Sequence, residues 1–111
     1  MGKYLKIMEI SGSELQEKID NNEKVIVEMY ATWCQPCLAM KPIFEKVSNQ
    51  NTSDVQMYMM DVDSNRDFAV KYGVRSVPTI KIFNGSSSVG TKVGLLSEGD
   101  IKELVSELIH E

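Results

Sequence analysis

Cysteine and histidine are scarce in this chain of 111 residues, which contains two cysteines and one histidine. Two cysteines cannot form a disulfide framework. Two cysteines and a single histidine, His110 near the C-terminus, also supply too few ligands for a four-ligand zinc site within one chain. We therefore expect no metal site. Tryptophan and proline are rare as well, with one and three copies, so the place of each is informative.

Long apolar runs are also absent. No stretch approaches the roughly 20 apolar residues of a membrane-spanning helix. The first ten residues, MGKYLKIMEI, lack the apolar core and small-residue cleavage site of a secretory signal. The formal net charge of −4 argues against nucleic-acid binding, which depends on clustered Lys and Arg. We therefore expect a cytoplasmic protein that binds neither membranes nor nucleic acids.

The composition is that of a globular protein, with 42% hydrophobic and 25% charged residues. A chain of this length can bury a core without covalent staples. We expect one domain over residues 1–111 and a monomer.

The hydrophobic pattern predicts alternating strands and helices. Strands are expected over 4–10, 25–30, 55–61, 79–83 and 89–93, and helices over 13–21, 34–49, 64–72 and 97–109. Three of the helix starts fit capping boxes, at Ser13-x-x-Gln16, Ser64-x-x-Asp67 and Ser97-x-x-Asp100. The order β α β α β α β β α predicts an α/β fold with a central mixed sheet of about five strands flanked by four helices.

Both cysteines lie in the stretch Trp33-Cys34-Gln35-Pro36-Cys37, between an apolar predicted strand and a predicted helix. At a helix N-terminus, free N–H groups and the helix dipole favour a thiolate at Cys34. Cys37 lies about one turn further along the same face, where it can attack a mixed disulfide formed at Cys34. The pattern predicts dithiol–disulfide exchange at the carboxyl end of a central strand. An inert, reduced cysteine pair is the alternative.

Several further segments accompany this motif, and together they resemble the thioredoxin family over nearly the whole chain. A lone C-x-x-C is a weak signal, but here Trp precedes it, Pro lies inside it and a Val-Pro-Thr follows some forty residues later. The matching segments are Val25 to Tyr30 with Ala31-Thr32-Trp33-Cys34-Gln35-Pro36-Cys37, Lys41-Pro42, Asp61-Val62-Asp63, Lys71-Tyr72-Gly73-Val74, Ser76-Val77-Pro78-Thr79, Phe83-Asn84-Gly85 and Lys92-Val93-Gly94.

The resemblance implies the thioredoxin fold and a protein disulfide reductase. Such a protein binds no cofactor and works through a redox-active disulfide, here Cys34–Cys37. Because the chain has no dinucleotide motif, its electrons would come from a flavin-containing thioredoxin reductase that uses NADPH, and its substrates would be proteins with disulfides.

Roles for individual residues follow from the same resemblance. Cys34 would be the attacking thiolate and Cys37 the buried resolving thiol. Trp33 would be a platform beside the sulfurs, Pro36 would stiffen the first helical turn, and Gln35 occupies the variable position between the cysteines.

A substrate groove is implied by the Val77-Pro78-Thr79 segment. Pro78 would follow a cis peptide bond and face the disulfide, which leaves the backbone of Val77 free to pair with an extended substrate segment. Gly94 would allow the backbone to approach the site closely.

Glu28 matches a position where the family keeps a buried aspartate that takes the proton of the resolving cysteine. Burial should raise the pKa of such a carboxyl group. Strand alternation also allows the alternative that Glu28 points to solvent with Ile26 and Tyr30.

The sequence departs from the family pattern near the predicted site. Gln35 replaces the usual glycine, Glu28 is longer than aspartate, Met59 stands where a lysine commonly pairs with the carboxylate, and Leu38 replaces a frequent cation. Without these cations we expect a less acidic Cys34 thiol in a protein that remains a reductant.

Two other functions stay open. Because the residues between the cysteines tune the reduction potential, the chain could be an oxidase or isomerase of more oxidising potential. It could also be a binding module that uses the surface around Trp33, Val77 and Gly94 without redox turnover.

Overall fold

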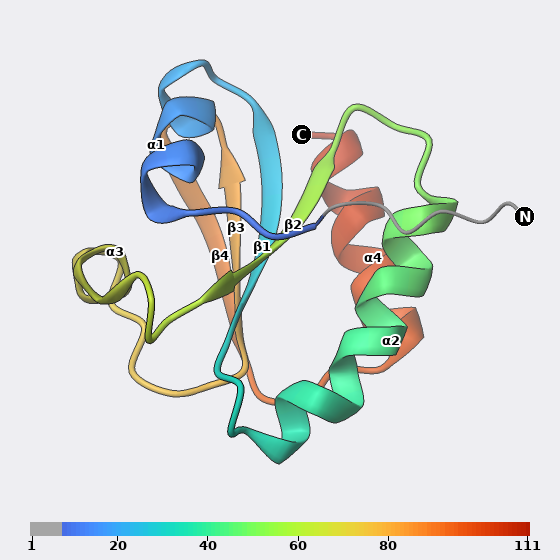
Figure 1. Ribbon diagram of the computed structural model, residues 1–111. Coiled ribbons are helices and arrows are strands. Elements are labelled where there is room, and N and C mark those ends of the chain that lie inside the picture. The colour runs from blue at the N-terminus through green and yellow to red at the C-terminus, as the bar shows by residue number, and fades with distance from the viewer. Residues whose placement is uncertain (1–7) are drawn as a thin grey trace, which may run out of the picture.

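The computed structural model describes residues 8–111. Within these residues, four helices and four strands form one sheet with helices on both of its faces (Figure 1). The elements are α1 (Gly12–Asp20), β1 (Lys24–Tyr30), α2 (Gln35–Gln50), β2 (Gln56–Asp61), α3 (Arg66–Lys71), β3 (Thr79–Asn84), β4 (Ser87–Val93) and α4 (Glu98–Ile109).

The sheet is mixed, with strand order β2-β1-β3-β4. β1 is parallel to β2 and antiparallel to β3, and β3 and β4 form an antiparallel hairpin. Of the strand expected over 4–10, residues 4–7 lie outside the described residues. At its end Glu9 forms a parallel bridge with Met59, beside β2 at the edge of the sheet. The predicted mixed α/β architecture is confirmed.

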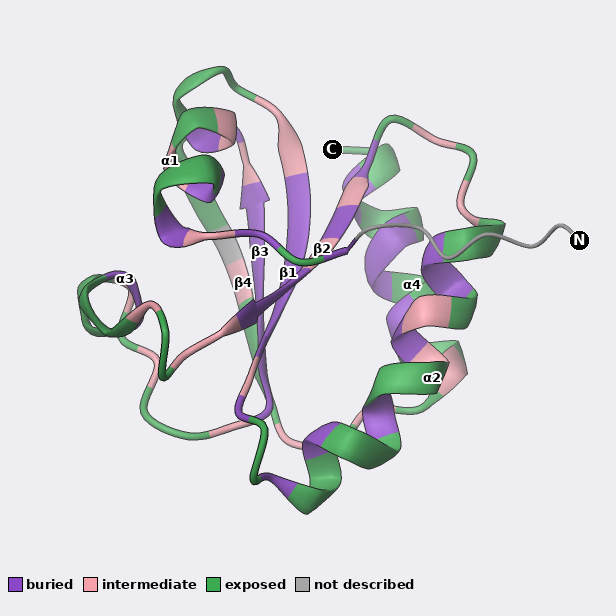
Figure 2. Ribbon diagram, viewed as in Figure 1, coloured by how far each residue is buried: buried purple, intermediate pink, exposed green. Residues whose placement is uncertain are grey.

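Strand β1 is buried along its length because helices cover both faces of the sheet. Val25, Val27 and Met29 pack in the core beneath α1, whereas Ile26 belongs to the core that contains α2 and α4 residues. Figure 1 shows α2 and α4 on one side of the sheet and α1 on the other, and Figure 2 shows the buried strands between them. This two-sided burial explains the nearly continuous apolar sequence of β1.

Two of the three predicted capping boxes are wrong. The N-cap of α1 is Ser11, whose hydroxyl accepts the Glu14 N–H while the Glu14 carboxylate accepts the Ser11 N–H, so Ser13 lies inside the helix. The N-cap of α3 is Asn65, and its side chain makes no capping hydrogen bond. At α4 the predicted Ser97 and Asp100 box is confirmed.

The hairpin is longer than predicted, because β4 begins at Ser87 rather than at residue 89. Within residues 8–111, no helix combines the length and the apolar composition that a membrane crossing requires.

Candidate active site

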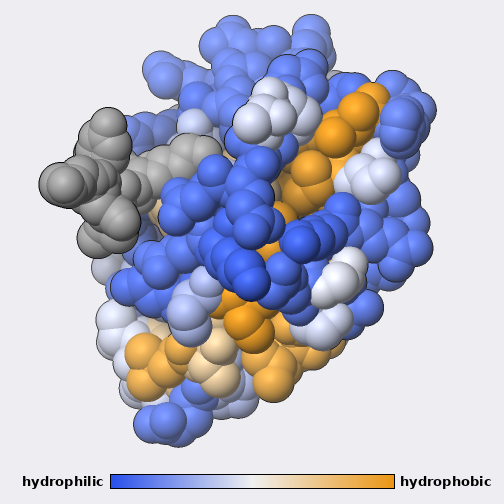
Figure 3. Space-filling view, turned by 90° about the vertical axis from the view of Figure 1, so that its right-hand side faces the viewer, coloured by the Kyte–Doolittle hydropathy of each residue, from blue (hydrophilic) through white to orange (hydrophobic). Residues whose placement is uncertain are grey.

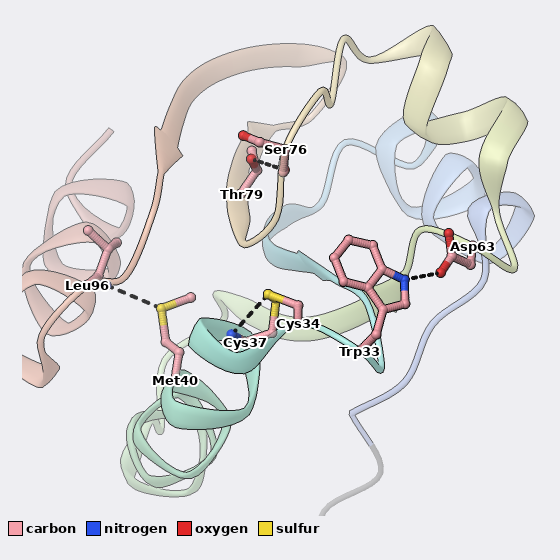
Figure 4. Close-up of a disulfide and its surroundings, with 8 residues drawn as sticks. All are labelled: Trp33, Cys34, Cys37, Met40, Asp63, Ser76, Thr79 and Leu96. Carbon is pink, nitrogen blue, oxygen red and sulfur yellow. Dashed lines mark hydrogen bonds between the residues drawn. A yellow bond between two sulfur atoms is a disulfide. The ribbon is translucent and has the colours of Figure 1, made fainter.

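The cysteine pair lies where β1 ends and α2 begins. Cys34 is the N-cap of α2, with extended backbone, and Pro36 and Cys37 lie in the first helical turn. The two sulfurs form a disulfide between α-carbons 5.2 Å apart. The Cys37 N–H donates a hydrogen bond to Cys34 Sγ at 3.2 Å (Figure 4). This donor and the start of the helix stabilise negative charge on the Cys34 sulfur after reduction.

Both cysteines are recessed in the protein surface. Cys34 is 4% exposed and Cys37 is 2% exposed, and both pack with Ala31. Gln35 and Pro36, between them, are exposed. A partner sulfur must therefore approach Cys34 along the surface formed by its neighbours, since the cysteine does not project into solvent.

The loop before β3 lies beside the disulfide. The Val77–Pro78 peptide bond is cis, as predicted, and Val77 packs against the cysteine cluster. Thr79 is buried, and its hydroxyl donates to the Ser76 carbonyl at 2.7 Å (Figure 4). Among the described residues, the backbone of Val77 makes no hydrogen bond. It is therefore available to an extended partner segment.

Gly94 joins this loop, since its N–H donates to the Pro78 carbonyl at 2.9 Å. Its φ angle of 98° lies in the region that favours glycine. A Cβ atom there would meet no described atom within 4 Å. The close backbone approach at Gly94 stays a prediction, and its backbone conformation accounts for the glycine.

Trp33 forms the exposed side of the site. Its side chain is 67% exposed, and the indole Nε1–H donates to Asp63 Oδ2 at 2.9 Å (Figure 4). Asp63 lies just after the end of β2, whereas Trp33 lies after the end of β1. The hydrogen bond between them holds the indole beside the cysteines. A groove of about 370 Å³ opens next to it. The residues that line this groove are Trp33, Val62, Val74, Arg75, Ser76 and Val77.

Two further apolar side chains are exposed on segments that follow site residues in the chain. Leu38, in the second turn of α2, is 52% exposed, and Leu95, just after Gly94, is 57% exposed. The next residue, Leu96, donates its N–H to Met40 Sδ at 3.3 Å, which joins this loop to α2 (Figure 4). Figure 3 shows apolar side chains gathered at the lower end of the molecule, the end at which α2 begins in Figure 1. Such a surface is suited to protein contact.

Glu28 lies in the middle of β1 and is fully buried. Its register partners are Met59 on β2 and Ile80 on β3, which both belong to the core that contains α2 and α4 residues. Strand alternation places Glu28 on the same side as Ile26, and helices cover that side. The alternative that Glu28 points to solvent is therefore wrong. Among the described residues, neither carboxylate oxygen has a hydrogen-bond partner.

Burial raises the pKa of Glu28 from 4.5 to about 8. Desolvation is the largest cause, because it penalises the charged form. Lys41 on α2 lowers the pKa, whereas the negative charges of Glu45 and Glu9 raise it. Met59 provides no cation beside the carboxyl group, so Glu28 holds its proton at neutral pH.

Tyr30 borders the site at the end of β1. The Tyr30 hydroxyl donates to Glu9 Oε2 at 2.6 Å. The Tyr30 side chain packs against the buried cluster of Ala31, Cys34 and Cys37. Burial, followed by the hydrogen bond to Glu9, raises the pKa of the Tyr30 phenol.

Metal binding finds no support in this part of the chain. Among residues 8–111, no three histidine, cysteine or carboxylate side chains gather in a way that could hold an ion. The arrangement supports sulfur chemistry instead, with one sulfur at a helix N-terminus and a second bonded to it.

Sequence reasoning missed Asp63, Arg75 and Lys41 as parts of the site. Asp63 lies 30 residues from the tryptophan that it binds, and Lys41 acts on a carboxyl group in a different element. No local pattern connects such pairs, because the fold alone brings them together.

Comparisons with known proteins agree with this geometry. The family model described as Thioredoxin matches residues 6–107. A thioredoxin of Buchnera aphidicola subsp. Acyrthosiphon pisum (strain APS) is 33% identical over 106 residues, which cover 95% of this chain and 98% of that protein. The solved N21Q mutant thioredoxin from Halobacterium salinarum NRC-1 superposes with a TM-score of 0.84 at 32% identity, covering 98% of this chain and 96% of the other. Chloroplastic thioredoxin z superposes with a TM-score of 0.82 at 28% identity, covering 99% and 100%.

Proposed function

This chain belongs to the thioredoxin family of thiol–disulfide oxidoreductases, and we propose that it acts as a protein disulfide reductase. The observation that carries the proposal is the position of Cys34, whose sulfur caps α2, accepts the Cys37 N–H and is bonded to the Cys37 sulfur. The exposed indole of Trp33 and the backbone of Val77, which makes no hydrogen bond within residues 8–111, border the cysteine pair and support the docking of a polypeptide.

The reaction begins with the reduced protein. The Cys34 thiolate attacks one sulfur of a substrate disulfide, the substrate S–S bond breaks, and the departing substrate sulfur takes up a proton. Cys37 then loses its proton and attacks the Cys34 sulfur, which releases the second substrate sulfur as a thiol. Two electrons and two protons pass to the substrate, and the protein is left with the Cys34–Cys37 disulfide.

Glu28 is the group that we assign to the proton of Cys37. Its pKa of about 8 lies close to the usual thiol value of about 8.5. A proton can therefore move between the two groups with little change in free energy. Burial, with no cation at Met59, keeps this carboxyl group protonated at rest. In this proposal Glu28 gives its proton to the departing substrate sulfur and, as the carboxylate, then takes the proton of Cys37.

The substrate groove in this proposal lies between Trp33 and the loop Val77-Pro78-Thr79, with Gly94 beside it. An extended substrate segment would pair with the backbone of Val77 and bring its cysteine to Cys34. Electrons return to the disulfide from a flavin-containing thioredoxin reductase that uses NADPH. We place this cycle in the cytoplasm, in a monomer that binds no cofactor.

A turnover assay with insulin as the disulfide substrate tests the proposal. With dithiothreitol as the electron source, the wild-type protein should accelerate insulin reduction, and Cys34→Ser should abolish the acceleration. Val70→Ala, at an exposed position on α3 outside the site, is the control for folding and handling. Equal rates for the wild-type protein and Cys34→Ser would refute the proposal.

The reduction potential separates a reductant from an oxidase or isomerase. Equilibration with glutathione should give a value near −270 mV, the range of reductants in this family, because Leu38 places no cation directly after the cysteine motif. A value near −120 mV would place the protein with the oxidants instead.

A further inference from the structure

We propose that Arg75 selects protein substrates that carry a carboxylate within two residues of the reacting cysteine. This inference rests on the proposed reductase function and names the class of substrate that the groove beside Trp33 prefers. In this class an acidic side chain lies in the groove while the neighbouring cysteine meets Cys34.

The groove itself has an apolar wall and a single charge. Of the residues that line it, Trp33, Val62, Val74 and Val77 are apolar, Ser76 is neutral and Arg75 is the one ionised side chain. The groove holds about 370 Å³, enough for a side chain of the substrate. Its wall excludes water from one side of an ion pair, which strengthens the attraction between a guanidinium and a carboxylate.

Arg75 has no carboxylate partner in the part of the chain that the structure describes. It is exposed, and none of the ion pairs or hydrogen bonds among residues 8–111 includes its side chain. The other arginine, Arg66, lies 3.7 Å from Asp63. A guanidinium offers a planar fork of donors that matches a carboxylate.

The acidic group that follows the groove in the sequence does not compete for Arg75. Asp63 follows groove residue Val62, but one of its oxygens accepts the Trp33 indole N–H and the other faces Arg66. The groove is thus positively charged on a protein whose formal net charge is −4. This local reversal of sign makes the groove complementary to an acidic segment and unfavourable for a basic one.

The position of Arg75 relative to the chemistry limits where the carboxylate can lie. Arg75 is two residues before Val77, whose backbone has no hydrogen-bond partner in the described part of the chain and can pair with an extended segment. Because an extended chain advances about 3.3 Å per residue, a side chain within two residues of the substrate cysteine stays within reach of the groove.

Three synthetic peptide disulfides provide the probe. Each is a dimer of one short peptide joined by its single cysteine, and the three differ only in having Glu, Gln or Lys two residues from that cysteine. One set of three peptides has the varied residue two positions before the cysteine, and a second set has it two positions after the cysteine. Reduced protein is mixed with each peptide, and the second-order rate of peptide-thiol release is measured by chromatography of acid-quenched samples.

We expect the wild-type protein to reduce the Glu peptide about fivefold faster than the Gln peptide, the upper range for an ion pair at an exposed rim. The Lys peptide should be slower still. Arg75→Gln should remove the preference, and Arg75→Glu should invert it so that the Lys peptide becomes the fastest. Raising the salt concentration to about 1 M should shrink the wild-type preference.

Lys71→Gln is the matched control, since it removes one positive charge from α3 outside the groove. This variant should keep the preference of the wild-type protein. Equal rates for the three peptides, or an unchanged preference in Arg75→Gln, would overturn the inference and leave the reductase proposal intact. Failure of the wild-type protein to reduce any of the peptides would overturn both.

Discussion

Replacing Glu28 with glutamine should change how the stability of the protein depends on pH. Glu28 is fully buried, and its pKa is about 8 in the folded protein against 4.5 as an ordinary glutamate. The folded state therefore binds this proton more tightly than the unfolded state does. Its contribution to stability is complete below about pH 4.5 and is lost as the pH rises through 8.

The magnitude follows from the gap between the two pKa values. At about 1.4 kcal/mol per pH unit, a rise from 4.5 to about 8 corresponds to a loss of about 5 kcal/mol of unfolding free energy. The amide side chain of the Glu28→Gln variant cannot ionise, so the variant should not show this loss. The stability difference between Glu28→Gln and the wild-type protein should therefore grow in favour of the variant between pH 5 and pH 9.

Urea unfolding of the oxidised protein at pH 5, 6, 7, 8 and 9 measures this difference. The oxidised form is used because disulfide cysteines do not titrate. The pKa values of Glu14, Glu98 and Asp100 are lowered, so these groups titrate below the pH range of the experiment. The pKa of Tyr30 is raised, so its phenol titrates above that range.

The control is Glu17→Gln, an exposed glutamate on α1, which should follow the wild-type curve. If the wild-type protein and Glu28→Gln instead show the same pH dependence, the carboxyl group is not held protonated in the core, and its assigned role in proton transfer is refuted.

Two further predictions concern the surroundings of Glu28 and the packing of α1. Lys41→Gln should raise the Glu28 pKa and Glu45→Gln should lower it, because the Lys41 charge lowers this pKa and the Glu45 charge raises it. Carbon-13 NMR of the Glu28 carboxyl group measures both pKa changes. Changes of the same sign in the two variants would contradict the electrostatic assignment. Gly12→Ala should destabilise the protein by about 1–3 kcal/mol, because a Cβ atom at this position would lie 2.8 Å from the Cβ of a buried phenylalanine. Gly99→Ala is the control, because a Cβ atom at this helical position would lie 3.8 Å from its nearest described neighbour. In thermal unfolding this variant should have unchanged stability or gain up to about 1 kcal/mol. Equal losses of stability in the two variants would contradict the packing argument.

Much of the architecture could be predicted because hydrophobic periodicity is a local signal. The unbroken apolar run at β1 indicated a strand covered on both faces, and the pattern after Ser97 indicated α4 with its cap. The start of α1 was harder. Ser11-x-x-Glu14 and Ser13-x-x-Gln16 both fit the capping pattern, and only the path of the chain leading into the helix decides between them.

The cysteine pair could be located from the sequence because its spacing is part of its chemistry. The charged surroundings of Glu28 could not be predicted from the sequence. The apolar run indicated a covered strand, but the charges that act on Glu28, those of Lys41, Glu45 and Glu9, come from other segments that only the fold brings close. The same holds for Asp63, whose hydrogen bond to Trp33 joins residues 30 positions apart.

Trapping of a mixed disulfide tests the central assignment most directly, namely that Cys34 attacks and Cys37 releases. Reduced Cys37→Ser and Cys34→Ser proteins are each mixed with a peptide disulfide, and the covalent adducts are quantified by mass spectrometry. Cys37→Ser should accumulate a stable adduct at Cys34, because the residue that resolves the adduct is missing, whereas Cys34→Ser should form little adduct. An adduct that forms as fast at Cys37 as at Cys34, or no adduct at either, would contradict the account.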